Sequence, residues 1–174
     1  TIPSCESWSN LICLQKEKEV VGIYISSHPL DDFTHEMEHF VSISLNRLGD
    51  LEPFLNQELS VGGIVNDVEH LESRNGKGWA RFTVEDFTDQ YEFRIFGEDY
   101  LKYRHFLVVN QFIRIRIMIR PGWANKETGK VGAPRMQYLS FEMLQNTLEN
   151  HAKKLTLQLD IHQLESTAAM YSAG

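Results

Sequence analysis

The sequence predicts a mainly β protein with flanking helices, and three observations support this fold class. Residues 113–119 place an isoleucine at every second position, which is the period of a strand buried on one face. The same two-residue period recurs in residues 60–71, 79–84 and 90–96. A hydrophobic content of 42% over 174 residues is enough for a core of ordinary size. We therefore expect one globular β domain with attachments.

Residues 1–58 are predicted to form a helical and linker segment before the β domain. Apolar residues separated by charged ones over residues 8–21 indicate an amphipathic helix. A second short helix is expected over about residues 29–40, because Pro29 suits a first helical position and the two aspartates after it complement the helix dipole. Residues 41–59 show no regular period and connect this segment to the next one.

Residues 59–145 are predicted to hold five strands and one helix. The expected strands are residues 60–71, 79–84, 90–96, 111–120 and 135–144, with a helix over residues 97–107. Gly62 and Gly63 permit the bend that closing a barrel requires, and Asn75-Gly76 marks a hairpin turn. Three strands, a helix and two strands are the element order of the five-stranded OB-fold Greek-key barrel.

Residues 146–174 are predicted to begin a further domain that is truncated here. A short helix is expected over residues 146–153, and residues 154–162 alternate as one more strand. A single strand has no partner of its own, which indicates that the rest of its sheet belongs to a longer chain.

The charge of the chain is negative overall but unevenly spread. The formal net charge is −7, and residues 1–58 hold three basic and ten acidic side chains. Residues 114–135 hold six basic side chains against Glu127 alone. Because a polyanion responds to the local field rather than to the net charge, this basic region suits a partner that carries phosphates.

Several classes of protein are disfavoured by composition. No run of about 18 apolar residues is present, and the N-terminus lacks the pattern of a signal peptide, so we expect a soluble, cytoplasmic protein without membrane contact. Cys5 and Cys13 have neither the spacing of a zinc site nor that of a disulfide framework, and we expect free thiols. No cofactor is expected.

One motif indicates a different chemistry. His35, Glu36 and His39 form a His-Glu-x-x-His sequence, which on a helix can place two imidazoles on one face to bind zinc while the glutamate polarises a water. The motif is flanked by acidic residues rather than by the apolar residues of a buried helix, and no third ligand is obvious. A zinc hydrolase is therefore the weaker hypothesis, and we expect neither a metal site nor a catalytic residue here.

The binding face of an OB-fold lies across strands two and three and between the loops that join strands one to two and four to five. The candidate nucleic-acid-binding residues are Arg74, Lys77, Trp79, Arg81, Arg94, Phe96, Arg114, Arg116, Arg120, Trp123, Lys126 and Lys130. The aromatic rings would stack on unpaired bases, and the cations would follow phosphates.

Each of these residues also has a purely structural alternative. Trp79 could cover the mouth of the barrel, and Phe96 could pack under the helix. Arg81 and Arg94 could pair with Glu92 or Glu85 across the hairpin, a surface arrangement that contributes little stability. The arginine-rich strand could simply present a solvated face. Trp123 is the sharpest candidate, because a tryptophan among glycine, asparagine and lysine has little local core to join.

Two separate motifs resemble the alpha subunit of bacterial DNA polymerase III. Residues 17–31 (EKEVVGIYISSHPLD) are similar to the segment that precedes the OB domain in that family. Residues 61–65 (VGGIV), 82–89 (FTVEDFTD) and 96–103 (FGEDYLKY) are similar to the OB domain itself, in the same order.

The resemblance implies a region of a polymerase without its catalytic residues. In the family an OB domain lies near the single-stranded template, which implies single-stranded DNA, the rest of the polymerase chain and clamp-loader or other replisome subunits as partners. The enzyme activity would belong to parts of the parent chain not present here. An OB barrel that serves only as a protein-interaction or spacer module is the main alternative, and the overall acidity favours it.

Overall fold

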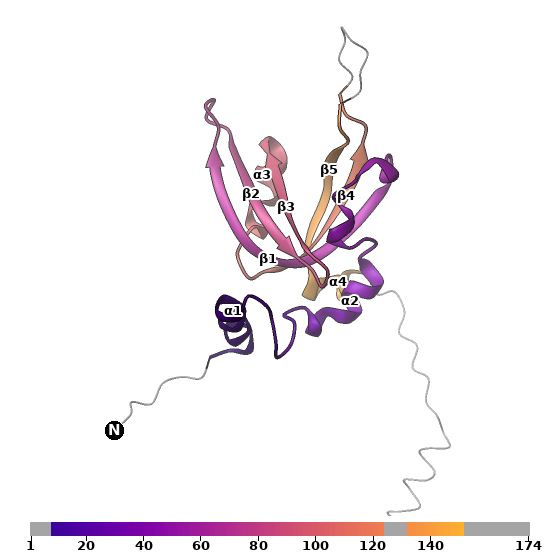
Figure 1. Cartoon of the computed structure of the whole chain (residues 1–174). Coiled ribbons are helices and arrows are strands. Elements are labelled where there is room, and N and C mark those ends of the chain that lie inside the picture. The colour runs from indigo at the N-terminus through magenta and orange to yellow at the C-terminus, as the bar shows by residue number, and fades with distance from the viewer. Residues whose placement is uncertain (1–7, 124–131, 152–174) are drawn as a thin grey trace, which may run out of the picture.

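Figure 1 shows the computed structural model of the chain, which describes residues 8–123 and 132–151. The helices are α1 (Asn10–Val21), α2 (Thr34–Phe40), α3 (Gly97–Tyr103) and α4 (Leu144–His151), with short 3-10 turns η1 (Asp31–Phe33), η2 (Leu45–Arg47), η3 (Glu52–Phe54) and η4 (Arg104–Phe106). The strands are β1 (Glu58–Glu72), β2 (Gly78–Glu85), β3 (Gln90–Phe96), β4 (Phe112–Arg120) and β5 (Arg135–Met143). These bounds confirm the predicted order of strands and helix.

The five strands form one antiparallel sheet in the order β3-β2-β1-β4-β5. The long strand β1 belongs to both halves of the sheet, because its first part pairs with β4 and its second part pairs with β2. In Figure 1 it curves between two arms, one made of β2 and β3 and the other of β4 and β5. The architecture is that of an OB-like fold.

The bend in β1 depends on close packing at Gly63. A Cβ atom at this position would lie 2.3 Å from the carbonyl oxygen of Glu85 and 2.6 Å from Cγ1 of Val84. A bulge between Val65 and Asp67 follows two residues later and adds to the local twist. The predicted bend is therefore confirmed, and its cause is that no side chain fits where β1 crosses the end of β2.

The alternation read from the sequence is confirmed in the core. Ile113, Ile115, Ile117 and Ile119 are fully buried on one face of β4. Ala80, Phe82 and Val84 on β2 and Phe93 and Ile95 on β3 are buried in the same cluster. A strand that buries one face shows a period of two residues, and for this reason the core was readable from sequence.

Strands β3 and β5 are the two edges of the sheet, and no backbone ladder joins them within the described residues. A closed barrel was expected, whereas the structure has an open seam at this place. A side chain bridges the seam, because the hydroxyl group of Tyr138 on β5 donates a 2.9 Å hydrogen bond to the carbonyl oxygen of Arg94 on β3. Burial raises the pKa of this Tyr138 hydroxyl well above its usual range.

The helices cover the sheet at different places. In Figure 1, α1, α2 and α4 lie at the end of the sheet opposite the β1–β2 turn. Helix α4 packs on β4 and β5 of the sheet, and its Leu144 and Thr147 are both fully buried. Helix α3 is tied to β5 because the hydroxyl group of Tyr103 donates a 2.7 Å hydrogen bond to the carbonyl oxygen of Leu139.

Some predictions cannot be compared with this structure. The strand expected at residues 154–162 lies outside the described residues, and the division of the chain into three domains stays a prediction. Among the described residues, no helix combines the length and the hydrophobicity needed to cross a membrane.

Candidate nucleic-acid interface

A stacked pair of aromatic rings lies on the outer face of β2 and β3. Trp79 and Phe96 are direct cross-strand neighbours, and their ring centroids are 5.2 Å apart with planes inclined by 18°. Phe96 remains 57% exposed, whereas Trp79 is half-buried. Their exposure follows from the alternation of both strands, since the intervening residues face the core. The pair offers a flat apolar surface of the kind on which an unpaired base can stack.

The arginines on the same face are paired with carboxylates. Arg81 and Arg94 are cross-strand neighbours. Arg81 makes a 2.5 Å ion pair with Glu69 on β1, and the hydrogen bond and charge of Glu69 raise the pKa of the Arg81 guanidinium. Arg94 pairs with Glu92 at 2.8 Å. Both arginines are thus paired with carboxylates as the structural alternative expected, but only the 3.7 Å contact of Arg81 with Glu92 crosses the β2–β3 hairpin, and all four side chains are exposed enough to exchange partners.

The β1–β2 turn presents Arg74 and Lys77 to solvent. Ser73 holds this turn, because its backbone N–H donates to the carbonyl oxygen of Lys77 at 2.9 Å and its hydroxyl accepts from the Lys77 N–H at 3.1 Å. Gly76 adopts a positive φ of 71°, as the predicted Asn-Gly turn requires. The two cations therefore stand on an ordered hairpin.

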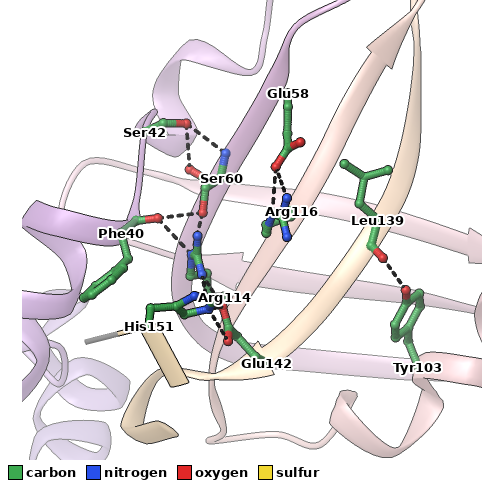
Figure 2. A network of polar contacts seen from close by, with 10 residues as sticks. All are labelled: Phe40, Ser42, Glu58, Ser60, Tyr103, Arg114, Arg116, Leu139, Glu142 and His151. Atoms are coloured by element: carbon green, nitrogen blue, oxygen red, sulfur yellow. Dashed lines mark hydrogen bonds and ion pairs between the residues drawn. The ribbon is translucent and has the colours of Figure 1, made fainter. Parts of the chain in front are cut away.

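Arg114 does not face solvent, which corrects the expectation that it contributes to a nucleic-acid surface. Its side chain points to the outer face of β4 as predicted, but α2 and α4 cover that face here, and Arg114 is 9% exposed. Its Nε donates to the carbonyl oxygen of Phe40 at 2.8 Å and to the hydroxyl of Ser60 at 2.7 Å (Figure 2). Its Nη1 forms an ion pair with Glu142, which also contacts His151. The guanidinium is occupied by protein groups.

The remaining cations of β4 differ in their partners. Arg116 pairs with Glu58 through a 2.7 Å hydrogen bond from Nε (Figure 2). Arg120 donates to the neutral side chain of Gln137 at 3.1 Å and lies opposite Arg135 on β5. Lys126 and Lys130, both predicted to bind nucleic acid, lie outside the described residues.

Trp123 lies just beyond the end of β4 and is 77% exposed. The guanidinium carbon of Arg135 lies 4.2 Å from the centroid of the Trp123 ring. Sequence reasoning counted Arg135 in the basic region but omitted it from the candidate site. The register of the β4–β5 hairpin would have placed it opposite Arg120, but contact with Trp123 depends on how the strand ends cross.

The open seam lies beside the β2–β3 face. A hollow of about 520 Å³ lies between the sheet edges, lined by Arg94 and Phe96 on one side and by Met136 and Tyr138 on the other. The sequence did not indicate it, because its two walls come from strands that are not neighbours in the ladder. The structure thus brings the β2–β3 face next to β5, one residue from Arg135.

The segment before the sheet is attached to the β2–β3 turn. Lys18 pairs with Glu85 and lies 4.7 Å from the centroid of the Tyr24 ring. The ring of His28 packs between Tyr24 and Phe87, at centroid distances of 5.2 and 4.8 Å. Burial lowers the pKa of His28, although the charges of Glu85 and Asp31 oppose this shift.

The His-Glu-x-x-His motif lies on α2 with its imidazoles side by side. The ring centroids of His35 and His39 are 4.2 Å apart, and Nδ1 of His39 is 2.9 Å from the carbonyl oxygen of His35. Within residues 8–123 and 132–151, no third His, Cys, Asp or Glu joins them in a metal-binding arrangement. A catalytic zinc is usually held by three protein ligands, and the described residues bring two imidazoles together here.

An open antiparallel sheet with a helix between its third and fourth strands defines the class of OB-like proteins, and this chain adds an exposed aromatic pair on the face of β2 and β3. The particular proteins that this chain resembles are DNA polymerase III alpha subunits. That of Borreliella burgdorferi is 35% identical over 100 residues, 57% of this chain and 8% of that protein. That of Pasteurella multocida is 25% identical over 180 residues, 98% of this chain and 15% of that protein.

The resemblance expected from the two sequence motifs is therefore confirmed. The alpha subunit of Escherichia coli O157:H7 is also similar, with 24% identity over 93% of this chain and 13% of that protein. The chain spans only about 8 to 15% of the length of these relatives. No family model matches the chain. RecG bound to a three-way DNA junction aligns with a TM-score of 0.34 and 13% identity over 95% of this chain and 26% of RecG, too weak a likeness to indicate a function.

Proposed function

We propose that this chain is a region of a DNA polymerase III alpha subunit that binds single-stranded DNA during replication and carries no catalytic residues itself. The observation that supports this function best is the stacked pair of Trp79 and Phe96, which lies on the face that OB-folds use for nucleic acid. The resemblance to DNA polymerase III alpha subunits supports DNA as the ligand of this surface.

The mechanism follows from the chemistry of the face. An unpaired base stacks on the exposed ring of Phe96, and this contact stabilises the complex by about 1–3 kcal/mol. Arg81 and Arg94 exchange their carboxylate partners for phosphates, and Arg74 and Lys77 meet the strand at the β1–β2 turn. Because every base has a π-face, the binding shows little sequence preference. The acidic partners of the arginines keep the affinity modest.

Titration of a fluorescently labelled oligothymidylate at two salt concentrations tests this proposal. Binding must weaken as salt rises, because phosphate contacts release counterions. Phe96→Ala should weaken binding, whereas Trp8→Ala, which removes an aromatic ring of similar exposure away from the face, should leave it unchanged. No binding at either salt concentration, or equal loss in both variants, would contradict the proposal.

A protein-interaction or spacer module is the second candidate, and one observation favours it. Val20, Val21, Ile23 and Ile25 are 83, 54, 64 and 63% exposed at the end of α1 and just after it. Glu17 holds this stretch in place by accepting hydrogen bonds from the backbone N–H groups of Ile25 and Ser26 at 2.8 and 2.9 Å. An ordered apolar strip of this kind suits contact with another protein surface, such as the rest of a polymerase chain or another replisome subunit.

A further inference from the structure

The open seam leaves one edge of β3 without a ladder partner among the described residues. In the β2–β3 turn, the N–H of Asp86 donates to the carbonyl oxygen of Asp89 at 2.9 Å, so this pair is hydrogen-bonded. Hydrogen-bonded and non-hydrogen-bonded pairs alternate along an antiparallel ladder, and by this count Glu92 and Arg94 belong to the non-hydrogen-bonded pairs. Their backbone N–H and C=O groups therefore point away from β2. The carbonyl oxygen of Arg94 agrees with this direction, because it accepts the hydrogen bond of Tyr138 from across the seam.

The hollow in the seam follows this strand edge rather than one face of the sheet. Its volume is about 520 Å³, and its wall on β3 includes Tyr91, Glu92, Phe93 and Arg94, which alternate between the two faces of the strand. Met136 and Tyr138 form the opposite wall on β5. Because successive side chains of a strand point to opposite faces, a hollow that both sets line must lie along the edge itself. The backbone groups of Glu92 and Arg94 therefore face this hollow.

The charge that lines the hollow is negative overall. Glu92 and Arg94 neutralise each other in a 2.8 Å ion pair. Asp99 on α3 also lines the hollow, and among the described residues it forms no ion pair. Burial, Tyr91 and the charge of Asp99 all raise the pKa of the Tyr138 hydroxyl, so Asp99 lies close to the β5 wall. A ligand of this hollow should therefore be cationic.

An extended peptide suits this edge better than a nucleic acid does. A phosphodiester backbone has no N–H group for the carbonyl oxygens of Glu92 and Arg94, and the carboxylate of Asp99 repels it. A peptide strand supplies donors and acceptors at the spacing of a β ladder, and addition of a strand to a free sheet edge is a common mode of peptide recognition. Its apolar side chains can pack on Met136 and on the ring of Tyr138.

We propose that the seam binds an extended, basic and apolar segment of another protein, which adds to the edge of β3 as a strand. The N–H groups of the segment donate to the carbonyl oxygens of Glu92 and Arg94, and a lysine or arginine contacts Asp99. The hydroxyl of Tyr138 occupies the Arg94 carbonyl oxygen in the unbound protein and leaves it when the segment binds. This inference goes beyond DNA binding by the β2–β3 face and does not depend on it.

Titration of the 174-residue chain with fluorescein-labelled synthetic peptides tests the charge preference. We expect a peptide of about nine residues with alternating valine and lysine to bind at least about tenfold more tightly than its counterpart with glutamate in place of lysine. Asp99→Asn should weaken binding of the lysine peptide about two- to fivefold. Glu98→Gln is the matched control, because Glu98 precedes Asp99 on α3, is exposed and does not line the hollow, so this variant should bind like the wild type.

Tyr138→Phe tests the place of binding with a change in the opposite direction. This variant removes the hydroxyl that competes for the Arg94 carbonyl oxygen, so the lysine peptide should bind about two- to tenfold more tightly even though the fold loses stability. A residue with a structural role alone would weaken binding when it is removed.

Residue-resolved amide hydrogen exchange, measured by NMR, tests strand addition itself. The amides of Glu92 and Arg94 should exchange more slowly when the lysine peptide is bound, because they gain hydrogen bonds. The amides of Phe93 and Ile95 already belong to the β2–β3 ladder and should not change.

Several outcomes would overturn the proposal. The lysine peptide could fail to bind at concentrations up to about 1 mM, or the glutamate peptide could bind equally well. Equal losses in Glu98→Gln and Asp99→Asn would show a general effect of charge. Unchanged exchange at Glu92 and Arg94 would exclude strand addition. Displacement of the peptide by oligothymidylate would assign the hollow to the DNA face, and a dimer that the peptide dissociates would identify a second copy of the chain as the occupant.

Discussion

Arg114 on β4 donates a 2.8 Å hydrogen bond from Nε to the carbonyl oxygen of Phe40, the last residue of α2. The two residues are 74 positions apart, and the same guanidinium contacts Glu142 on β5 and lies 3.3 Å from Nε2 of His151 on α4. One buried side chain thus joins the segment before the sheet to the helix after it.

Removal of this guanidinium should strongly destabilise the fold. We expect Arg114→Met to lower the free energy of unfolding by about 3–5 kcal/mol, because it removes a buried guanidinium and leaves the largely buried carboxylate of Glu142 with His151 as its remaining partner among the described residues. Arg116→Met removes an exposed ion pair with Glu58 on the same strand and should cost at most about 1 kcal/mol. Urea unfolding followed by circular dichroism measures both values, and equal losses would contradict this role for Arg114.

A methyl group at Gly63 should destabilise the bend in β1. Gly63→Ala places Cβ against the backbone of Glu85, so the strands must move apart, and we expect a loss of about 1–3 kcal/mol. Gly49→Ala is the matched control, because no atom lies within 4 Å of the Cβ atom it would add, and it should stay within about 0.5 kcal/mol of the wild type. Thermal unfolding of the two variants provides the comparison.

Among the described side chains, the hydroxyl group of Tyr138 is the one that forms a hydrogen bond across the seam between β3 and β5. Tyr138→Phe removes the bond to the carbonyl oxygen of Arg94 and should cost about 0.5–1.5 kcal/mol. Backbone amides of β3 should then exchange hydrogen faster, as detected by mass spectrometry. Tyr91 lines the same hollow, and its hydroxyl makes no hydrogen bond within the described residues. Tyr91→Phe should therefore leave the hydrogen exchange of β3 unchanged.

The attachment of the N-terminal segment should weaken in acid because of His28. Burial lowers its pKa below 6.5, so the unfolded chain binds the proton more readily than the folded one. Its contribution to stability is therefore complete above about pH 6.5 and is lost as the pH falls toward the lower pKa of the folded state. Protonation of Nδ1 also removes the acceptor of the 3.2 Å hydrogen bond from the Leu30 N–H.

Unfolding free energies measured from about pH 5 to about pH 7.5, in steps of about half a pH unit, would reveal this dependence. His28→Gln should flatten the slope, because the side chain no longer titrates. His35→Gln is a control on the exposed face of α2 and should keep the wild-type slope. A slope that is the same in all three proteins would rule out His28 as its source.

The zinc hypothesis predicts a metal content that can be measured directly. We expect the protein purified without chelators to hold far less than one zinc per chain, because His35 and His39 have no third ligand among the described residues. Elemental analysis by mass spectrometry gives the ratio. Stoichiometric zinc that is lost in His39→Ala would contradict this expectation.

The alternating isoleucines of β4 and the apolar faces of β2 and β3 determined the strands, their order and the core from sequence alone. The reason is local, because a strand buried on one face repeats every two residues whatever it packs against. The Asn75-Gly76 turn and the glycines of β1 were readable for the same reason, since backbone conformation and close approach restrict residue type at the position itself.

Only the tertiary structure decided which cations are available to a ligand. Arg114 and Arg120 occupy equivalent positions in the alternation of β4, yet α2 and α4 cover the first while the second lies near exposed Trp123. The partner of Arg81 comes from another strand and that of Arg135 from beyond a strand end, whereas Arg94 pairs with Glu92 on its own strand. A period in the sequence specifies the face on which a side chain lies, but only the packing of distant segments specifies what covers that face or neutralises its charge.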